Sequence, residues 1–229
     1  MSETNAAEET QSQPAAPERF EVILASSSPR RRQLLEEAGV VFRVQTPITP
    51  VDESLASLDP DVAADPAEAC KKLAEKKAGA VVQDVLTQDF TGMAAIIGAD
   101  TMVVLDGQIF GKPRSLSDGK RMLRQLSGRT HQVMTAVSLW LVSAPDAEKV
   151  SLGFRTFIDI AQVTFRDLTD QEIDDYLRKG ESFDKAGAYA VQGEGAALVS
   201  RVDGSLSTVI GLPVERLLAD FPDLATPAS

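Results

Sequence analysis

The sequence predicts an α/β protein built on a mixed, twisted sheet. Short apolar segments typical of buried strands alternate with segments that begin at capping residues and end at glycine, as helices do. Hairpin signals occur among them, and a purely parallel sheet has no hairpins. Together these observations favour helices combined with a sheet of both strand directions.

The first half of the chain alternates strands with capped helices. A serine or aspartate before a proline marks two helix starts, because the side chain accepts first-turn N–H groups and proline fits the first helical position. In chain order we expect a strand at 20–25, a helix capped by Ser28 and closed by Gly39, a strand at 40–47, a helix after Asp65 with Glu68 completing a capping box, and two strands within 94–113 joined by a hairpin turn at Asp106-Gly107.

The second half carries the longest expected strands. Thr169 and Glu172 have the spacing of a capping box. In chain order we expect a helix at 117–128 with Met122, Leu123 and Leu126 on one face, strands at 131–142 and 154–165 joined by a loop at 143–149, a helix from 170 that ends before Gly180, a hairpin around 202–204, and a final helix opened by Pro213.

The domain organisation is expected to be simple. Residues 1–18 lack aromatic and β-branched apolar residues, which predicts a disordered acidic tail. Residues 19–221 read as a single domain, and residues 222–229 as a flexible tail. No stretch between the tails has the composition of a linker.

Composition excludes several classes of protein. A formal net charge of −11 and a pI near 4.6 argue against nonspecific nucleic-acid binding, which needs a basic face. No apolar run is long enough for a membrane span, and the acidic start lacks the features of a secretory signal. Cys70 is the one cysteine, so no internal disulfide forms and a cytoplasmic location is expected. His131 is the one histidine, and we expect it to be structural.

Residues 25–39, ASSSPRRRQLLEEAG, place three arginines at a helix start. Arg30 and Arg31 fall in the first turn, where the helix dipole disfavours cations. In one interpretation Ser28 only caps the helix and the arginines are solvated. In the other, the free N–H groups and the guanidinium groups bind a phosphate. We assign Arg32 to solvent in both.

Two charged residues interrupt apolar patterns. Lys77 lies on the apolar face of its helix, in line with Leu73 and Val81, so its ammonium group either extends to solvent or reaches an anion. Lys72 and Lys76 project sideways and are expected in solvent. Asp100 interrupts a strand that should be buried, where a carboxylate needs a partner. It is either a structural acceptor or a metal ligand or general base.

Further polar residues are weak signals alone. Glu53, next to Asp52, lies in a loop after the second strand, and Lys112 lies between glycine and proline at a strand end. Tyr189 and Gln192 lie in a glycine-rich stretch that is either a flexible loop or a ligand contact. Taken with the cations and Asp100, the carboxylates match metal-assisted phosphate chemistry, in which carboxylates hold a divalent metal ion and cations stabilise phosphoryl oxygens.

Several motifs, in this order, resemble those of the Maf family of nucleoside triphosphate pyrophosphatases, also called septum-formation inhibitor proteins. The resemblance covers about residues 21–218. The motifs are LASSSPRR, VDE, LAEKKA, IIGADT, FGKP, SGRTHQVMTAVSL and FDKAGAYAVQGEGA followed by VDGSLSTVIGLPVERL.

The resemblance implies two lobes around a deep central cleft, similar to inosine triphosphate pyrophosphatases, and a homodimer. It also implies hydrolysis of nucleoside triphosphates between the α and β phosphates, with a divalent metal, Mg²⁺ or else Mn²⁺ or Co²⁺. By motif position, Asp100 matches the catalytic proton acceptor. The positions tied to base selection are Arg30, Thr101 and Gln192, and those assigned to phosphate and metal binding are Ser28, Arg31, Glu53, Lys77 and Lys112, with Glu53 and Asp100 as metal ligands.

The stretch DKAGAYAVQG, with GADT and THQVMTAV, is similar to the family branch that prefers dTTP and UTP, with CTP as a further candidate. A second branch acts on 7-methyl-GTP and carries a different sequence there. A third hypothesis makes the protein a nucleotide-binding regulator of cell division. The carboxylates and cations favour an enzyme over such a regulator, because a protein that only binds nucleotides needs no group that activates water.

Overall fold

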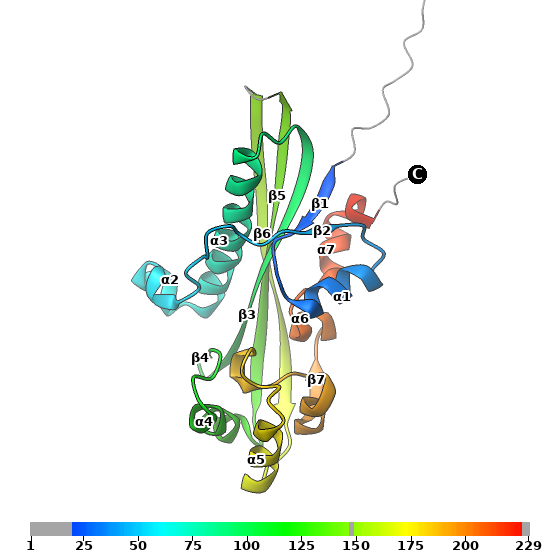
Figure 1. Ribbon diagram of the computed structural model, residues 1–229. Coiled ribbons are helices and arrows are strands. Elements are labelled where there is room, and N and C mark those ends of the chain that lie inside the picture. Colours follow the sequence, from blue (N-terminus) through cyan, green and yellow to red (C-terminus); the bar gives the residue numbers. More distant parts are fainter. Residues whose placement is uncertain (1–19, 147–148, 226–229) are drawn as a thin grey trace, which may run out of the picture.

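The computed structural model describes residues 20–146 and 149–225. Within them a seven-stranded mixed sheet has the order β2-β1-β3-β5-β6-β7, and β4 pairs with β3 (Figure 1). β1 is parallel to β2 and β3, whereas the remaining pairs are antiparallel. The strands are β1 (Glu21–Leu24), β2 (Arg43–Val44), β3 (Gly92–Leu105), β4 (Gln108–Phe110), β5 (Thr130–Asp146), β6 (Lys149–Phe165) and β7 (Val199–Asp203).

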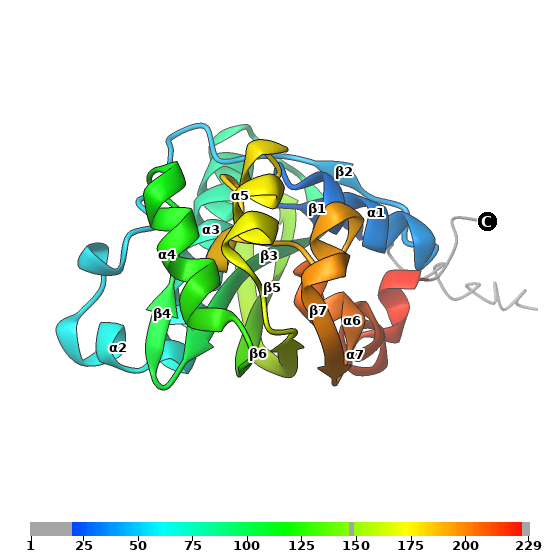
Figure 2. The same cartoon turned by 90° about the horizontal axis from the view of Figure 1, so that it is seen from below.

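Helices cover both faces of this sheet. Seen along the strands, α3 lies on one side and α1, α6 and α7 lie on the other (Figure 2). The helices are α1 (Pro29–Glu37), α2 (Pro60–Ala64), α3 (Pro66–Thr87), α4 (Leu116–Leu126), α5 (Asp170–Arg178), α6 (Leu206–Ile210) and α7 (Val214–Asp220), with 3₁₀ turns at Leu55–Ser57, Ala186–Ala188, Gly193–Leu198 and Pro222–Ala225. The expected mixed α/β class is confirmed.

The long strands connect two lobes. At one end α4 and α5 pack on the sheet around a core that includes Leu123, Phe165 and Ile173. At the other end α1 and α7 cover one face and α3 covers the opposite face, each over a separate apolar cluster. Segments of β3 and β5 contribute to both lobes, so the sheet fixes the position of each lobe relative to the other. No helix in residues 20–146 or 149–225 is long and apolar enough to cross a membrane.

A close contact fixes the position of α3 against the middle of β3. A Cβ added to Gly98 would lie 2.7 Å from both the Cβ and the backbone nitrogen of Ala78, and 2.9 Å from the Ala74 carbonyl oxygen. Only glycine on the strand, facing alanines on the helix, allows this approach. Because strand side chains alternate, Asp100 projects from the same face of β3 as Gly98, toward α3.

Most capping signals predict the helix starts correctly. Ser28, Asp65 and Thr169 are the N-caps of α1, α3 and α5, and Thr169 forms the expected capping box with Glu172. Glu68 instead pairs with Lys71 at 2.7 Å. The helix expected at 117–128 begins one residue earlier, at Leu116, because Ser115 is its cap, and it buries the three expected apolar residues.

Four expectations about individual segments are wrong. The strand expected at 40–47 is reduced to β2. The loop expected at 143–149 is mostly strand, since β5 continues to Asp146 and β6 begins at Lys149. The hairpin around 202–204 does not form, because β7 pairs with the distant end of β6 and leads into α6. Residues 222–225, expected in a tail, form a 3₁₀ turn that buries Leu224. Residues 1–18 and 226–229 lie outside the described residues.

His131 is a core residue, as expected. It is buried, and its Nε2 atom lies 2.7 Å from the hydroxyl oxygen of Tyr189. Its ring contacts those of Tyr189 and Phe165 edge to face. Tyr189, considered above as a ligand contact, is therefore buried structure in the α4–α5 lobe rather than an open binding surface.

We predict that acid weakens this lobe through His131. Burial lowers the pKa of His131 to about 4, whereas an unfolded chain has a value of about 6.5. The unfolded chain therefore binds the proton first, so the free energy of unfolding falls as the pH drops from about 6.5 to about 4. Between pH 7 and pH 5 this loss is about 2 kcal/mol. Urea unfolding at both pH values measures it. His131→Phe should show a smaller loss, and equal losses in both proteins would contradict the prediction.

Candidate active site

Lys77 joins the two predicted carboxylates. Its Nζ atom lies 2.7 Å from Oδ1 of Asp100 and 3.1 Å from Oε2 of Glu53. The Lys77 and Asp100 side chains are 13% and 11% exposed, whereas that of Glu53 is 49% exposed. The Gly98 contact explains the arrangement, because it sets α3 directly against β3 where Lys77 and Asp100 face each other. Of the two interpretations of Lys77, the structure selects the one in which it reaches an anion.

The loop that carries Glu53 is fastened to α3. Nζ of Lys76 donates to the Ser57 hydroxyl at 2.8 Å and lies 3.4 Å from the Asp52 carbonyl oxygen. The Asp52 carboxylate accepts the backbone N–H of Ser54, and this hydrogen bond holds the pKa of Asp52 below its ordinary value. The expectation that Lys76 extends into solvent is therefore wrong, because its ammonium group binds this loop. Lys76 holds the loop beside Lys77 and so places Glu53.

Arg31 folds back into the protein instead of extending from its helix. Its Nε donates to the Gly211 carbonyl at 2.8 Å, Nη1 donates to the Ser26 hydroxyl at 3.2 Å, and Nη2 donates to the Thr101 hydroxyl at 3.2 Å. Desolvation lowers the pKa of Arg31 below its ordinary value, and the negative charge of Asp100 opposes that shift. Since a guanidinium group has five N–H donors, one on each terminal nitrogen stays available for a ligand.

Two linked hydroxyl groups, on the half-buried Thr101 and the fully buried Thr135, support Arg31. Thr101 lies 3.0 Å from the Thr135 hydroxyl, and Thr135 donates to the Thr208 carbonyl at 2.7 Å. Glycine at position 211 permits this arrangement around Arg31, because its φ is +125° and an added Cβ would lie 3.2 Å from the Thr101 hydroxyl oxygen. The polar chain links the N-terminus of α1 to β3, β5 and α6. The sequence reasoning missed Thr135 and Gly211, although a threonine inside a strongly apolar strand was a visible signal.

The other predicted residues are more loosely placed. Ser28 caps α1, with its hydroxyl 3.5 Å from the Arg31 backbone nitrogen. Arg30 pairs with Asp184 at 3.6 Å, and this contact connects α1 to the turn after α5. Lys112 is exposed and has no hydrogen bond or ion pair with a described residue, and Gln192 is exposed at the start of a 3₁₀ turn. The structure therefore joins Glu53, Lys77 and Asp100, and separately Ser28, Arg31 and Thr101. Direct contacts do not link Arg30, Lys112 or Gln192 to either group among the described residues.

Cys70 is buried next to Asp100, and its thiol is unreactive. It is fully buried, and its Sγ atom lies 3.4 Å from the Asp100 carbonyl oxygen. Burial, together with the charge of Asp100, raises the pKa of Cys70 to about 12. Its thiol therefore stays protonated at neutral pH and does not act as a nucleophile.

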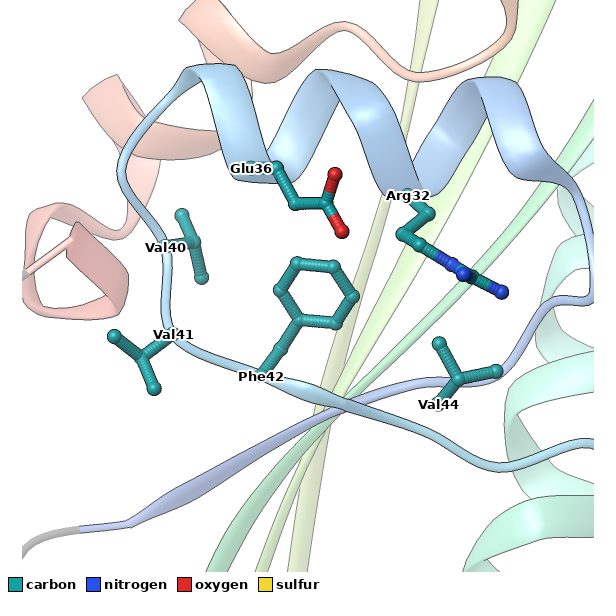
Figure 3. A pocket seen from close by; sticks show the side chains of 6 residues that line it. All are labelled: Arg32, Glu36, Val40, Val41, Phe42 and Val44. Carbon is teal, nitrogen blue, oxygen red and sulfur yellow. The ribbon is translucent and has the colours of Figure 1, made fainter.

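An open hollow of about 470 Å³ lies between α1 and the segment that leads into β2 (Figure 3). Arg32 and Glu36 line it on the helix, and Val41, Phe42 and Val44 line it on the strand side. None of the predicted site residues lines this hollow. Arg32 faces solvent there, in agreement with its assignment.

The donor set fits a divalent metal ion that is bound together with substrate. Among residues 20–146 and 149–225 no three acidic, histidine or cysteine side chains are grouped as a ready metal cage. Glu53 and Asp100 nevertheless converge on one ammonium group. One or two carboxylates completed by substrate phosphates are the usual ligands of Mg²⁺ in phosphate-processing sites.

The fold and these contacts define a mixed α/β protein whose candidate site combines two carboxylates with half-buried cations. Residues 21–222 match the Maf-like protein family. The chain belongs to this family.

Curated relatives extend over nearly the whole chain. A "dTTP/UTP pyrophosphatase" of Bacillus cytotoxicus is 39% identical over 90% of this chain and 97% of its own length. Proteins with the same name in Moorella thermoacetica and Bacillus velezensis are 43% and 41% identical, over 87% and 86% of this chain and 94% and 93% of their own lengths. A solved nucleoside-triphosphatase (dITP/XTP pyrophosphatase) of Mycobacterium abscessus is 13% identical over 90% of this chain and 95% of its own, with a TM-score of 0.39, which is too low to support an argument.

We predict that Thr135→Val lowers the free energy of unfolding by disrupting the hydrogen bonds that hold Arg31 in place. Valine keeps the shape but leaves the Thr208 carbonyl without the hydroxyl donor and the Thr101 O–H without its acceptor, which costs about 1–3 kcal/mol. Thr130→Val is the matched control on the same strand, because Thr130 is exposed and its side chain bonds, within the described part of the chain, only to the Thr164 hydroxyl. The control should change stability by less than about 0.5 kcal/mol. Chemical unfolding measures both, and equal losses would show that the Thr135 hydroxyl contributes nothing particular.

Proposed function

We propose that this chain hydrolyses nucleoside triphosphates, with dTTP and UTP favoured and CTP a further candidate, between the α and β phosphates. The products are the monophosphate and pyrophosphate, and the role is the removal of unwanted nucleotides. The names of the curated relatives support this proposal. The observation that carries it is the contact of Asp100 and Glu53 with a single partly buried ammonium group.

Asp100 is the proposed general base. It removes a proton from a water molecule, whose oxygen attacks a phosphorus of the α–β anhydride in line with the bond that breaks. Lys77 keeps Asp100 in position and holds a positive charge beside the reacting group. The bridging oxygen leaves with the pyrophosphate, and cations that contact its oxygens stabilise the charge that develops there.

Arg31, Arg30 and Lys112 are the proposed phosphate contacts. Arg31 is held by three hydrogen bonds, and its two remaining N–H groups can donate to phosphate oxygens. Arg30 has only a long, exposed ion pair to give up, and such pairs contribute little to stability. Lys112 brings an ammonium group with no described partner. Ser28 adds the N-terminus of α1 to the same group of donors.

Glu53 and Asp100 are the proposed ligands of a divalent metal ion, Mg²⁺ or else Mn²⁺ or Co²⁺. When bound, such an ion supplies Lewis-acid polarisation of phosphoryl oxygens. Base selection is assigned to Arg30, Thr101 and Gln192. Because the Thr101 hydroxyl already contacts Arg31 and Thr135, its effect on selection is expected to pass through the position of Arg31. A homodimer in the cytoplasm completes the proposal.

Asp100→Asn tests the role of the base. The change keeps the shape but removes the basic carboxylate, so kcat for dTTP and UTP should fall by about 10² to 10⁴-fold. Asp106→Asn is the control, since Asp106 is exposed in the β3–β4 turn, pairs with Arg129 alone among the described residues, and has a positive φ that asparagine tolerates. Its turnover should match the unmodified protein. Full turnover by Asp100→Asn would contradict the assignment.

A nucleotide panel with and without chelation tests the activity itself. Pyrophosphate release is measured on dTTP, UTP, CTP and 7-methyl-GTP with Mg²⁺ and again with excess chelator. We expect release from dTTP and UTP that chelation abolishes. Tight binding without turnover of any triphosphate would instead indicate a regulator, and preference for 7-methyl-GTP would assign the chain to the other branch.

A further inference from the structure

The outer edge of β6 has no paired strand over most of its length. β5 pairs with β6 along its length, but β7 reaches only Gln162–Phe165, at the end near α4 and α5 (Figure 1). Between Lys149 and Ala161 no described strand pairs with the other side of β6. An edge of this kind presents unpaired N–H and C=O groups that a further strand can bond.

The direction of these backbone groups follows from the antiparallel ladder. The Phe165 N–H donates to the Arg129 carbonyl beside β5, so odd-numbered residues of β6 bond to β5 and even-numbered ones face outward. The Ile158 carbonyl agrees, because it accepts a hydrogen bond from Arg216 of α7 on that outer side. Leu152, Phe154 and Thr156 therefore offer outward backbone groups.

The side chains along this edge are unusually apolar for an exposed strand. Val150, Leu152 and Phe154 are 47%, 46% and 56% exposed, and Phe154 stacks on Trp140 of β5 at 4.5 Å. Natural edge strands usually carry prolines, bulges or inward charges that prevent pairing, and none of these devices occurs from Val150 to Phe154.

We propose that this edge is the docking surface for a second copy of the chain, with the two β6 strands antiparallel about Gly153. The homodimer implied by the family resemblance specifies no surface, and this inference is independent of the proposed activity. An antiparallel pair about a two-fold axis uses the same residues on both copies, so the edge needs to complement only itself.

The register follows from the side chains. Centring on Gly153 places Leu152 opposite Phe154 of the second copy, twice, so that apolar residues pair across the axis. Centring one residue earlier would oppose Arg155 directly to Lys149, a like-charge pair. Centring one residue later would oppose Leu152, next to the axis, to the polar Thr156, whereas the Gly153 register places Thr156 opposite Val150, farther from the axis. Gly153 suits the axis, because an added Cβ there has no atom within 4 Å.

A single cysteine at the axis tests both the surface and the register. Gly153 lies at a position that does not bond to the second copy, where facing Cα atoms are about 4.5 Å apart, within the range of a disulfide. Under mild oxidation Gly153→Cys should form a covalent dimer almost completely. Ser151→Cys is the matched control, since two copies of residue 151 would be offset by four residues along the strands. Cys70 is buried and contributes no link.

Analytical ultracentrifugation of the full chain supplies the second measurement. Phe154→Lys should raise the dimer dissociation constant by roughly tenfold or more, by loss of a central aromatic contact and by charge. Val41→Lys, at an apolar residue 70% exposed beside the hollow of Figure 3, should leave the constant unchanged. A monomeric unmodified chain, cross-linking at Ser151 equal to that at Gly153, or dissociation by Val41→Lys alone would overturn the proposal. Occupation of the edge by residues 1–19 of the same chain would give the first of these results.

Discussion

The close approach of α3 to β3 at Gly98 is the constraint on which the site depends. Ala74 and Ala78 face a strand position without a side chain, so the helix lies directly against the strand. One residue before Ala78 stands Lys77, and two residues after Gly98 stands Asp100. Both side chains therefore emerge at the same point, and the loop held by Lys76 adds Glu53. A larger residue at Gly98 would separate the elements that carry the charges.

Partial burial strengthens the electrostatic interaction between these charged side chains. An exposed ion pair contributes little, but Lys77 and Asp100 lie where water is largely absent, so each carboxylate or cation there requires a partner. Arg31 shows the same requirement with neutral partners, since three oxygens accept its N–H groups. A triphosphate with its metal ion would enter a site whose polar groups are already oriented, which is the condition for electrostatic stabilisation of a transition state.

Local rules predicted much of the fold. Ser28, Asp65 and Thr169 marked helix starts because capping depends on a few neighbouring residues. The hairpin expected at 202–204 failed because a strand's partner can be far away in the sequence: β7 pairs with the end of β6, and the turn residues do not record this. The 143–149 loop failed for a similar reason, since pairing of β5 with β6 overrides the weak strand propensity of alanine and aspartate there.

The candidate site was predictable where a charge contradicts its surroundings. Lys77 on an apolar face and Asp100 in an apolar strand each need a partner, and the structure pairs them with each other. The partners of Arg31 were not predictable, because the Gly211 carbonyl and the Thr101 hydroxyl come from segments distant in sequence. The expectation that Arg31 waits for an anion is corrected in part: protein oxygens already accept three of its N–H groups.

A double-mutant cycle between Lys77 and Asp100 tests most directly whether their contact organises the site. The free energy of unfolding is measured for the unmodified chain, Lys77→Met, Asp100→Asn and the double variant. Each single change leaves a buried polar group with a weakened partner, so we expect the double variant to be more stable than the sum of the single effects predicts, by about 2 kcal/mol. Single effects that add to within about 0.5 kcal/mol would contradict the account.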